Sequence, residues 1–76
     1  MNWRDHIVLD PGICHGKPTF RGTRVLVSTV LAYLAAGRAE AEVHEDFPSL
    51  GPHAIHAALA YAADLISGER VLTIAR

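Results

Sequence analysis

Three cations and two glycines are concentrated within residues 16–25, and these residue types can bind an anion. Pro18 fixes one backbone angle, and Gly22 can adopt the positive φ that other residues avoid. We therefore predict a loop of one defined shape that presents its cations. Such a loop can position phosphate groups without reading bases, or it can bind carboxylates. The candidate residues for binding a nucleic acid or a partner are Lys17, Arg21, Gly22, Thr23 and Arg24.

The loop cations have a structural alternative, because carboxylates occur elsewhere in the chain. The first 25 residues carry both cations and carboxylates, whereas residues 40–46 hold Glu40, Glu42, Glu45 and Asp46 without a cation. The loop cations could therefore pair with Asp10 or with this acidic segment. The sequence leaves the binding and the structural interpretation open.

Residues 12–18 share some features with the phosphate-binding loop, which has four residues between its glycines and a Ser or Thr after its lysine. Here three residues separate Gly12 from Gly16, and Pro18 follows Lys17. Proline offers neither a hydroxyl group for Mg²⁺ nor an amide for phosphate. We predict a turn between strands here, and no nucleotide site.

The cysteine and the histidines suggest two further kinds of site. Cys14 and His15 are adjacent, so in an extended segment their side chains point in different directions and do not form a nucleophile with its base. His53 and His56 lie one helical turn apart, but two ligands are too few for a zinc site. We therefore predict no catalytic residue, no metal and no cofactor, and we expect a binding protein and not an enzyme.

The chain has 76 residues, which predicts one domain with a small core. Half of the residues are hydrophobic, and the mean hydropathy is +0.18. This is more apolar material than so small a fold readily buries, so we expect self-association or a protein partner. The net charge of −1 argues against binding nucleic acid over the whole surface.

A single cysteine excludes an internal disulfide framework and is typical of proteins of the reducing cytosol. The N-terminal residues lack the apolar core of a signal peptide. No apolar run approaches the roughly 20 residues that span a bilayer. We expect a cytoplasmic protein with no membrane contact.

The elements that would position the loop are short strands. The run at residues 7–9 is typical of a strand, and Asp10, Pro11 and Gly12 predict a turn after it. Residues 13–14 are expected to form a second short strand. Phe20 and residues 25–27 are expected to form further strand pieces, paired across the loop.

A first helix is predicted after the loop, with Ser28 as its N-cap. Its apolar face is formed by Val27, Val30, Leu31 and Leu34, at the spacing of one helical side. Gly37 fits the left-handed position that ends many helices. A short acidic helix is predicted over residues 39–46, with a narrow apolar stripe beneath its charges.

A third helix is predicted from Pro52 to about Ile66, and it is apolar over most of its circumference. Such a helix is buried, in the core or against a second copy of the chain. We therefore predict a homodimer or higher oligomer. The predicted interface residues are Ala58, Leu59, Tyr61, Ala62 and Leu65.

These elements predict an α+β fold that is mainly α. Residues 1–27 form a β-rich basic arm, residues 28–67 a three-helix bundle, and residues 68–76 a short C-terminal strand or tail, with the strand at 71–74. The bundle is expected to be helix-turn-helix-like, of the homeodomain-like or winged kind. Its third helix lacks the Arg, Lys, Asn and Gln side chains that read bases, so packing is the favoured role of this helix.

The run I-V-L-D-P-G-I-C-H-G-K-P-T-F-R-G-T-R-V-L-V at residues 7–27 resembles the opening of the bacterial family called domain of unknown function 433. The apolar helix, Gly37, the acidic helix, Phe47 with Pro48, and the Ala-rich helix then follow in that family's order. One departure is that the family usually has a serine and a proline where this chain has Arg38 and Ala39. The helix N-cap that the resemblance implies is therefore missing.

The resemblance implies a small VapB-type antitoxin, whose toxin partner is a PIN-like ribonuclease. It leaves open whether the protein also binds its operator DNA. The alternative is a free-standing, helix-turn-helix-like DNA-binding transcriptional regulator.

Overall fold

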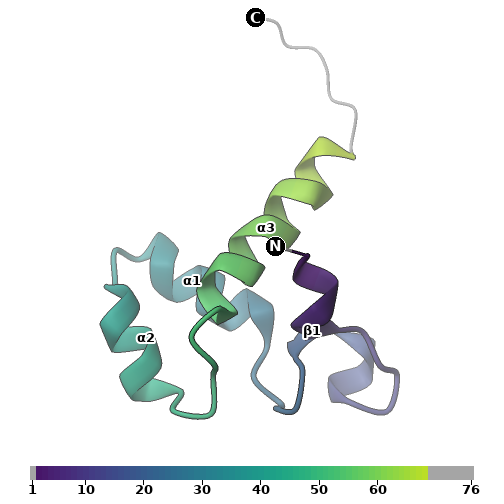
Figure 1. The fold of residues 1–76 in the computed structure, drawn as a ribbon, viewed down its shortest axis with the longest axis horizontal. Helices are drawn as coiled ribbons and strands as arrows, with labels where there is room; N and C mark the ends of the chain where they lie inside the picture. The colour runs from purple at the N-terminus through teal and green to yellow at the C-terminus, as the bar shows by residue number, and fades with distance from the viewer. Residues whose placement is uncertain (1, 69–76) are drawn as a thin grey trace, which may run out of the picture.

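The computed structural model describes residues 2–68, which form three α-helices and a two-stranded antiparallel sheet. Figure 1 shows α1 (Val27–Ala35) and α2 (Glu40–Asp46) on one side of the molecule and the N-terminal arm on the other. The third helix, α3 (Ala54–Ser67), lies between them, and its C-terminal part extends away from the body. The predicted mixture of short strands and three helices is confirmed. The strand predicted at residues 71–74 lies outside the described residues.

The N-terminal arm contains η1 (Trp3–Asp5), β1 (Ile7–Val8), η2 (Cys14–Gly16) and β2 (Thr19–Phe20). In the sheet, Ile7 lies opposite Phe20 and Val8 opposite Thr19, and a single further bridge joins Thr19 to Leu26. The pairing of Phe20 with the first strand across the loop is therefore confirmed. The strand predicted at residues 13–14 is wrong, because the backbone at Cys14 has a φ of 50° and turns there.

Helix α1 begins one residue before the predicted N-cap, so the role predicted for Ser28 is wrong. Leu26 is the N-cap residue, and no side chain caps the helix. The bridge between Thr19 and Leu26 brings the chain back past Pro18, whose carbonyl oxygen accepts from the Val27 N–H at 3.0 Å. The Val27 N–H, at the start of α1, is thus paired with a backbone carbonyl oxygen of the arm. A cap at Ser28 would leave this N–H without a partner.

Gly37 ends α1 as predicted, with a φ of 86°. The Gly37 N–H donates to the Leu34 carbonyl oxygen, and the Arg38 N–H donates to that of Tyr33, each at 3.0 Å. These two bonds are those of the Schellman motif. Helix α2 follows directly, and the Glu42 carboxylate accepts from the Ala39 N–H at 2.9 Å. Glu42 thus compensates in part for the missing N-cap side chain.

A polar clasp of Tyr33, Arg38 and Asp46 joins α1 to α2. The Tyr33 hydroxyl donates to Asp46 Oδ2 at 3.1 Å, and Arg38 pairs with Asp46 at 3.6 Å and with Glu42 at 3.4 Å. The Arg38 guanidinium also lies 4.9 Å from the centre of the Tyr33 ring. Within residues 2–68, every ion pair made by the acidic helix goes to Arg38 and none to the loop cations.

Helix α3 begins at Ala54, two residues later than Pro52 predicts. The Ala54 N–H donates to the Gly51 carbonyl oxygen, so residues 51–54 form a turn that Pro52 stabilises outside the helix. The helix ends at Ser67, close to the predicted end. None of the helices within residues 2–68 combines the length and the apolar character that crossing a membrane requires.

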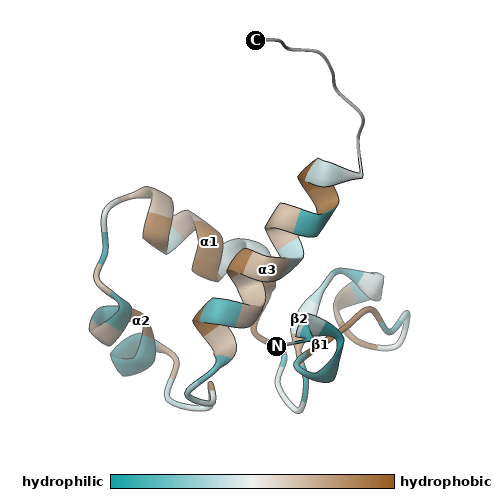
Figure 2. Cartoon of the chain, turned by 45° about the horizontal axis from the view of Figure 1, so that its top comes forward, coloured by the Kyte–Doolittle hydropathy of each residue, from teal (hydrophilic) through white to brown (hydrophobic). Residues whose placement is uncertain are grey.

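The core lies where the first half of α3 meets α1, α2 and the sheet. Figure 2 shows brown, hydrophobic segments on α1 and on α3. Val30, Val43, Ala57 and Ala58 have no exposed surface at all. The remaining buried apolar residues are Ile7, Phe20, Val27, Leu50, Ala54 and Ile55. The alanines of α3 allow close helix contact in this half.

Candidate binding site on the N-terminal arm

Arg21 holds the arm together, in addition to being exposed. Its Nε donates to the Asp5 carbonyl oxygen and its Nη2 donates to the Arg4 carbonyl oxygen, each at 3.1 Å. Its backbone N–H donates to the His6 carbonyl oxygen at 2.8 Å. One arginine therefore ties the end of β2 to η1, a role that residue type and spacing alone do not predict. Its remaining N–H groups have no hydrogen-bond partner within residues 2–68.

Gly22 and Thr23 shape the loop. Gly22 has a φ of 80°, as predicted, and the Thr23 N–H donates to the Phe20 carbonyl oxygen at 3.0 Å, which is the pattern of a type II turn. The Thr23 hydroxyl donates to the same oxygen at 2.8 Å and accepts from the Val25 N–H at 3.0 Å. The polar groups of Thr23 are thus engaged inside the turn.

Lys17 and Arg24 remain as exposed cations of the predicted loop. Neither makes an ion pair with a carboxylate of residues 2–68, so the pairing with Asp10 that the sequence left open is not found. Arg24 borders a shallow hollow of about 330 Å³ together with Ile13 and Thr23. The structure thus divides the predicted cation set: Arg21 ties the arm, while Lys17 and Arg24 project.

The segment Cys14–Gly16 has an unusual backbone. Cys14, His15 and Gly16 have φ values of 50°, 60° and 83°, so three successive residues occupy the left-handed region. Each non-glycine residue there costs roughly 1–2 kcal/mol. The Cys14 thiol donates to the Arg24 carbonyl oxygen at 3.6 Å, which joins this segment to the loop. The premise that Cys14 and His15 are extended is therefore wrong.

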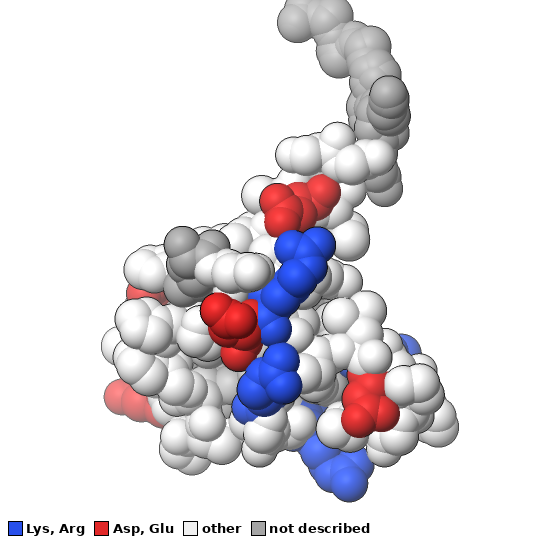
Figure 3. All heavy atoms as spheres, turned by 45° about the vertical axis from the view of Figure 1, so that its right-hand side comes forward, with Lys and Arg blue, Asp and Glu red and all other residues white. Residues whose placement is uncertain are grey.

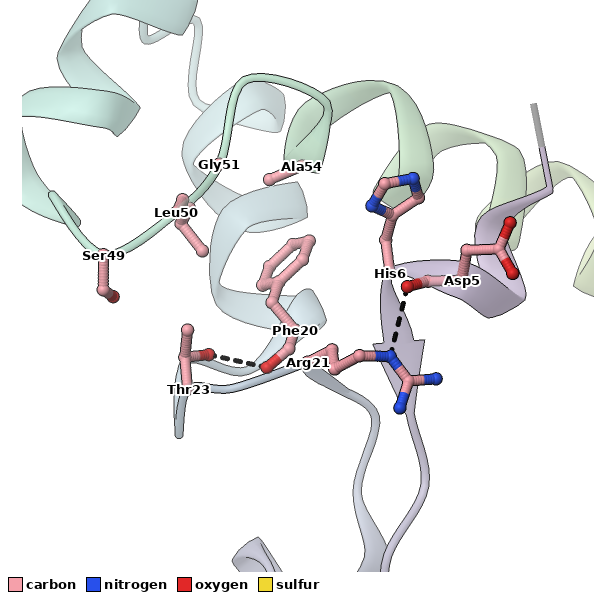
Figure 4. Close-up of a pocket in the computed structure, with 9 residues that line it drawn as sticks. All are labelled: Asp5, His6, Phe20, Arg21, Thr23, Ser49, Leu50, Gly51 and Ala54. Atoms are coloured by element: carbon pink, nitrogen blue, oxygen red, sulfur yellow. Dashed lines mark hydrogen bonds between the residues drawn. The ribbon is translucent and has the colours of Figure 1, made fainter.

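A pocket of about 230 Å³ opens between the arm and the turn that leads into α3. Its floor is apolar, because Phe20, Leu50 and Ala54 line it and are each at most 8% exposed. Figure 4 shows His6 on one side of this floor and Ser49 with Thr23 on the other. The stem of Arg21 runs along the edge of the pocket, and its guanidinium group reaches away from it, toward Asp5.

Sequence reasoning missed this pocket, because its two walls are far apart in the chain. One residue, Leu50, does indicate in the sequence that part of this turn is buried, because it is apolar and lies between two prolines of the turn. Such a residue is buried when the turn folds back on the core, and Leu50 is 8% exposed.

The arginines of the arm form a basic stripe, defined here as Arg4, Arg21 and Arg24. Arg21 bonds to the backbone of Arg4, and Arg24 follows in the same loop. Figure 3 shows Lys and Arg side chains close to one another on one face, with Asp and Glu side chains beside them. The Arg4 guanidinium lies 4.5 Å from the centre of the Trp3 ring, which holds it against the surface. Arg4 is a member that the sequence analysis did not select.

The two histidines considered as metal ligands both lie at the start of α3. His53 is the residue before α3, and its ring centre lies 5.9 Å from that of His6. His56 is exposed. Among residues 2–68, no group of three or more His, Cys, Asp and Glu side chains is arranged to hold a metal ion.

The predicted interface residues divide between core and surface. Ala58 is fully buried in its own chain, so it is not available for an interface, and its prediction is corrected. Tyr61 packs edge-on against Trp3, with ring centres 4.7 Å apart, and Ala62 is half-buried. Leu59 and Leu65 are 48% and 55% exposed, and Ile66, which was not selected, is 69% exposed. We call Leu59, Leu65 and Ile66 the exposed α3 end.

Comparison with known proteins assigns the chain to a family. The model of the family described as "Protein of unknown function (DUF433)" matches residues 7–62. The uncharacterized protein y4eO of Sinorhizobium fredii (strain NBRC 101917 / NGR234) is 40% identical over 68 residues, which are 88% of this chain and 31% of that protein. The chain thus spans about a third of the length of this curated relative. No solved structure matches the present chain. The matched region includes the whole arm loop and most of α3, and the chain therefore belongs to the DUF433 family.

Proposed function

We propose that this chain is an antitoxin-type binding protein, which neutralises a PIN-like ribonuclease toxin by occupying it. The observation that carries the proposal is the exposed α3 end. Three large aliphatic side chains there are about half exposed or more, on a helix that leaves the body of the molecule. Large apolar side chains exposed on one helix favour a surface that binds a partner. A helix presenting such side chains is a common means of docking into a groove.

The structure gives this helix a rigid base. Trp3 Nε1 donates to Asp64 Oδ2 at 2.6 Å, and the Trp3 ring contacts Tyr61. The arm thus supports one side of α3 up to its last turns. A helix held in its bound conformation loses less conformational entropy on binding than a free one.

The exposed cations supply a second contact in this proposal. We expect a PIN-like ribonuclease to carry an acidic metal site, and Lys17 or Arg24 would face its carboxylates. Arg21 is less suited to this role, because two of its N–H groups already bind the arm.

The second candidate is a DNA-binding regulator, alone or as a further role of the antitoxin. It is favoured by the exposed Lys17 and Arg24 and by the succession of α2, a turn and α3, which would be the helix-turn-helix-like unit. It is disfavoured by the exposed carboxylates of Glu40, Glu45 and Asp46 on α2, which repel phosphate.

Expression together with the product of the adjacent reading frame tests the proposal. If the proposal holds, that product alone arrests growth, growth is restored by this chain, and the two proteins purify together. A harmless neighbour that does not copurify would reject the antitoxin function. A salt-dependent mobility shift of duplex DNA by the isolated chain would then favour the regulator.

A further inference from the structure

The pocket on the arm has the size of one side chain. Its volume is about 230 Å³, whereas an apolar cavity of about 150 Å³ is enough to hold benzene. Phe20, Leu50 and Ala54 close it from below, so a guest would contact apolar atoms on its inner side. A leucine or phenylalanine side chain fits this space and this chemistry.

Two charged residues line the pocket, Arg21 and Asp5, and they do not form an ion pair with each other. Arg21 borders it, and the free N–H groups of Arg21 lie outside it, beside Arg4. Arg24 lies next to Thr23, which lines this pocket, and Arg24 itself borders the second hollow, with Ile13. No carboxylate of residues 2–68 lies within ion-pair distance of these arginines. A guest with an apolar anchor and a neighbouring carboxylate would satisfy both features.

We propose that the pocket and the basic stripe together bind an extended acidic peptide segment of a partner protein. One Leu or Phe side chain fills the pocket, and an Asp or Glu next to it pairs with the outward N–H groups of Arg21 and with Arg4. The site lies at the first residue of α3 and shares no residue with the exposed α3 end, whose first member is Leu59. It can therefore be tested independently of the antitoxin proposal.

A peptide fits this face better than a nucleic acid does. The carboxylate of Asp5 follows Arg4 in the chain, and Asp64 accepts a hydrogen bond from Trp3, on whose ring Arg4 lies. Figure 3 shows acidic groups beside the basic side chains of this face. A continuous phosphate backbone would meet these carboxylates, whereas a segment with one or two acidic side chains can avoid them.

Fluorescence anisotropy with a labelled, end-capped short peptide tests the proposal. The probe contains one Phe followed by Glu and Asp, in a Gly and Ser background, and the protein is the full chain. For a single anchor with a charge contact we expect a dissociation constant between about 10 μM and 1 mM. Replacing the Phe of the probe with Ala should weaken binding about tenfold, and replacing its acids with amides about fivefold.

Two protein variants locate the site. Arg4→Gln should weaken binding of the acidic probe about fivefold but leave binding of the amide probe unchanged. The backbone carbonyl oxygen of residue 4, which accepts from Arg21, is retained in this variant, so Arg21 should keep its position. Gly51→Phe should narrow the pocket and weaken both probes. A Cβ at Gly51 meets no heavy atom within 4 Å, so the backbone at this position has room for the start of a side chain. Lys17→Gln removes the same charge outside the pocket lining and serves as the matched control.

Three results would overturn the proposal. They are no binding at about 1 mM protein, equal binding of the Phe and Ala probes, and tighter binding of an oligothymidine than of the acidic peptide. The last result would identify the stripe as a nucleic-acid surface. The fold of Gly51→Phe is checked by urea unfolding, and Arg4→Gln keeps the test decisive if that variant does not fold.

Discussion

At the scale of single residues, Arg21 combines a structural and a surface role. Its side chain bonds to two carbonyl oxygens at the end of η1, while the rest of its guanidinium group faces solvent. Hydrogen bonds that involve a charged group contribute more than neutral ones, even though solvent screens this exposed site. Arg24 lies three positions further along the chain and makes no side-chain hydrogen bond within residues 2–68. The two arginines are therefore a matched pair for separating stability from binding.

We predict that Arg21→Ala lowers the free energy of unfolding by about 1–2 kcal/mol, since both bonds to η1 are lost. Arg21→Lys should recover little of this, because an ammonium group cannot donate with the same fork geometry. Arg24→Ala should change stability by less than about 0.5 kcal/mol. Urea unfolding monitored by Trp3 fluorescence measures all three. Equal stabilities of the two alanine variants would show that Arg21 does not hold the arm.

At the scale of elements, the clasp sets the geometry between α1 and α2. The hydrogen bond from the Tyr33 hydroxyl to Asp46 raises the pKa of Tyr33 above its ordinary value of 10.0, since it stabilises the protonated phenol. A group with a raised folded-state pKa contributes stability below its unfolded pKa, and this contribution disappears as the pH rises through the folded value. The hydrogen bond from Tyr33 to Asp46 therefore contributes to stability at neutral pH, and this contribution is lost as the pH rises above about 10.

We predict that Asp46→Asn lowers the pKa of Tyr33 toward 10, because the amide no longer holds the phenol by charge. Titration of phenolate absorbance measures this change, and Tyr33→Phe identifies which of the two tyrosines gives the signal. An unchanged titration curve in Asp46→Asn would show that the bond between Tyr33 and Asp46 is absent in solution.

The exposed α3 end makes a second prediction at this scale, on self-association. A second copy of the chain is the partner available to the isolated protein, so the exposed α3 end should support a weak dimer. Sedimentation at tens of micromolar should detect it. The double variant Leu65→Ser with Ile66→Ser should be monomeric. A folded wild-type monomer at this concentration would contradict the prediction.

At the scale of the whole molecule, the sequence predicts the elements better than their contacts. The period of Val27, Val30, Leu31 and Leu34 and the stop at Gly37 define α1, because local geometry determines both. The prediction of Ser28 as the N-cap is wrong, since the actual start of α1 depends on the bridge from Thr19 to Leu26, which is a tertiary contact. The roles of Arg21 and the pocket depend on such contacts too, and no local pattern encodes them.

The central claim is that the exposed α3 end binds the toxin partner. Isothermal titration of the purified chain with the product of the adjacent reading frame measures it, using wild type, Leu65→Ser with Ile66→Ser, and Leu9→Ser as control. Leu9 is 53% exposed, close to the 55% of Leu65, but it lies in the arm. We expect the double variant to keep wild-type stability within about 0.5 kcal/mol and to bind at least tenfold more weakly. Leu9→Ser should bind as wild type does. Equal affinity of all three proteins would contradict the claim.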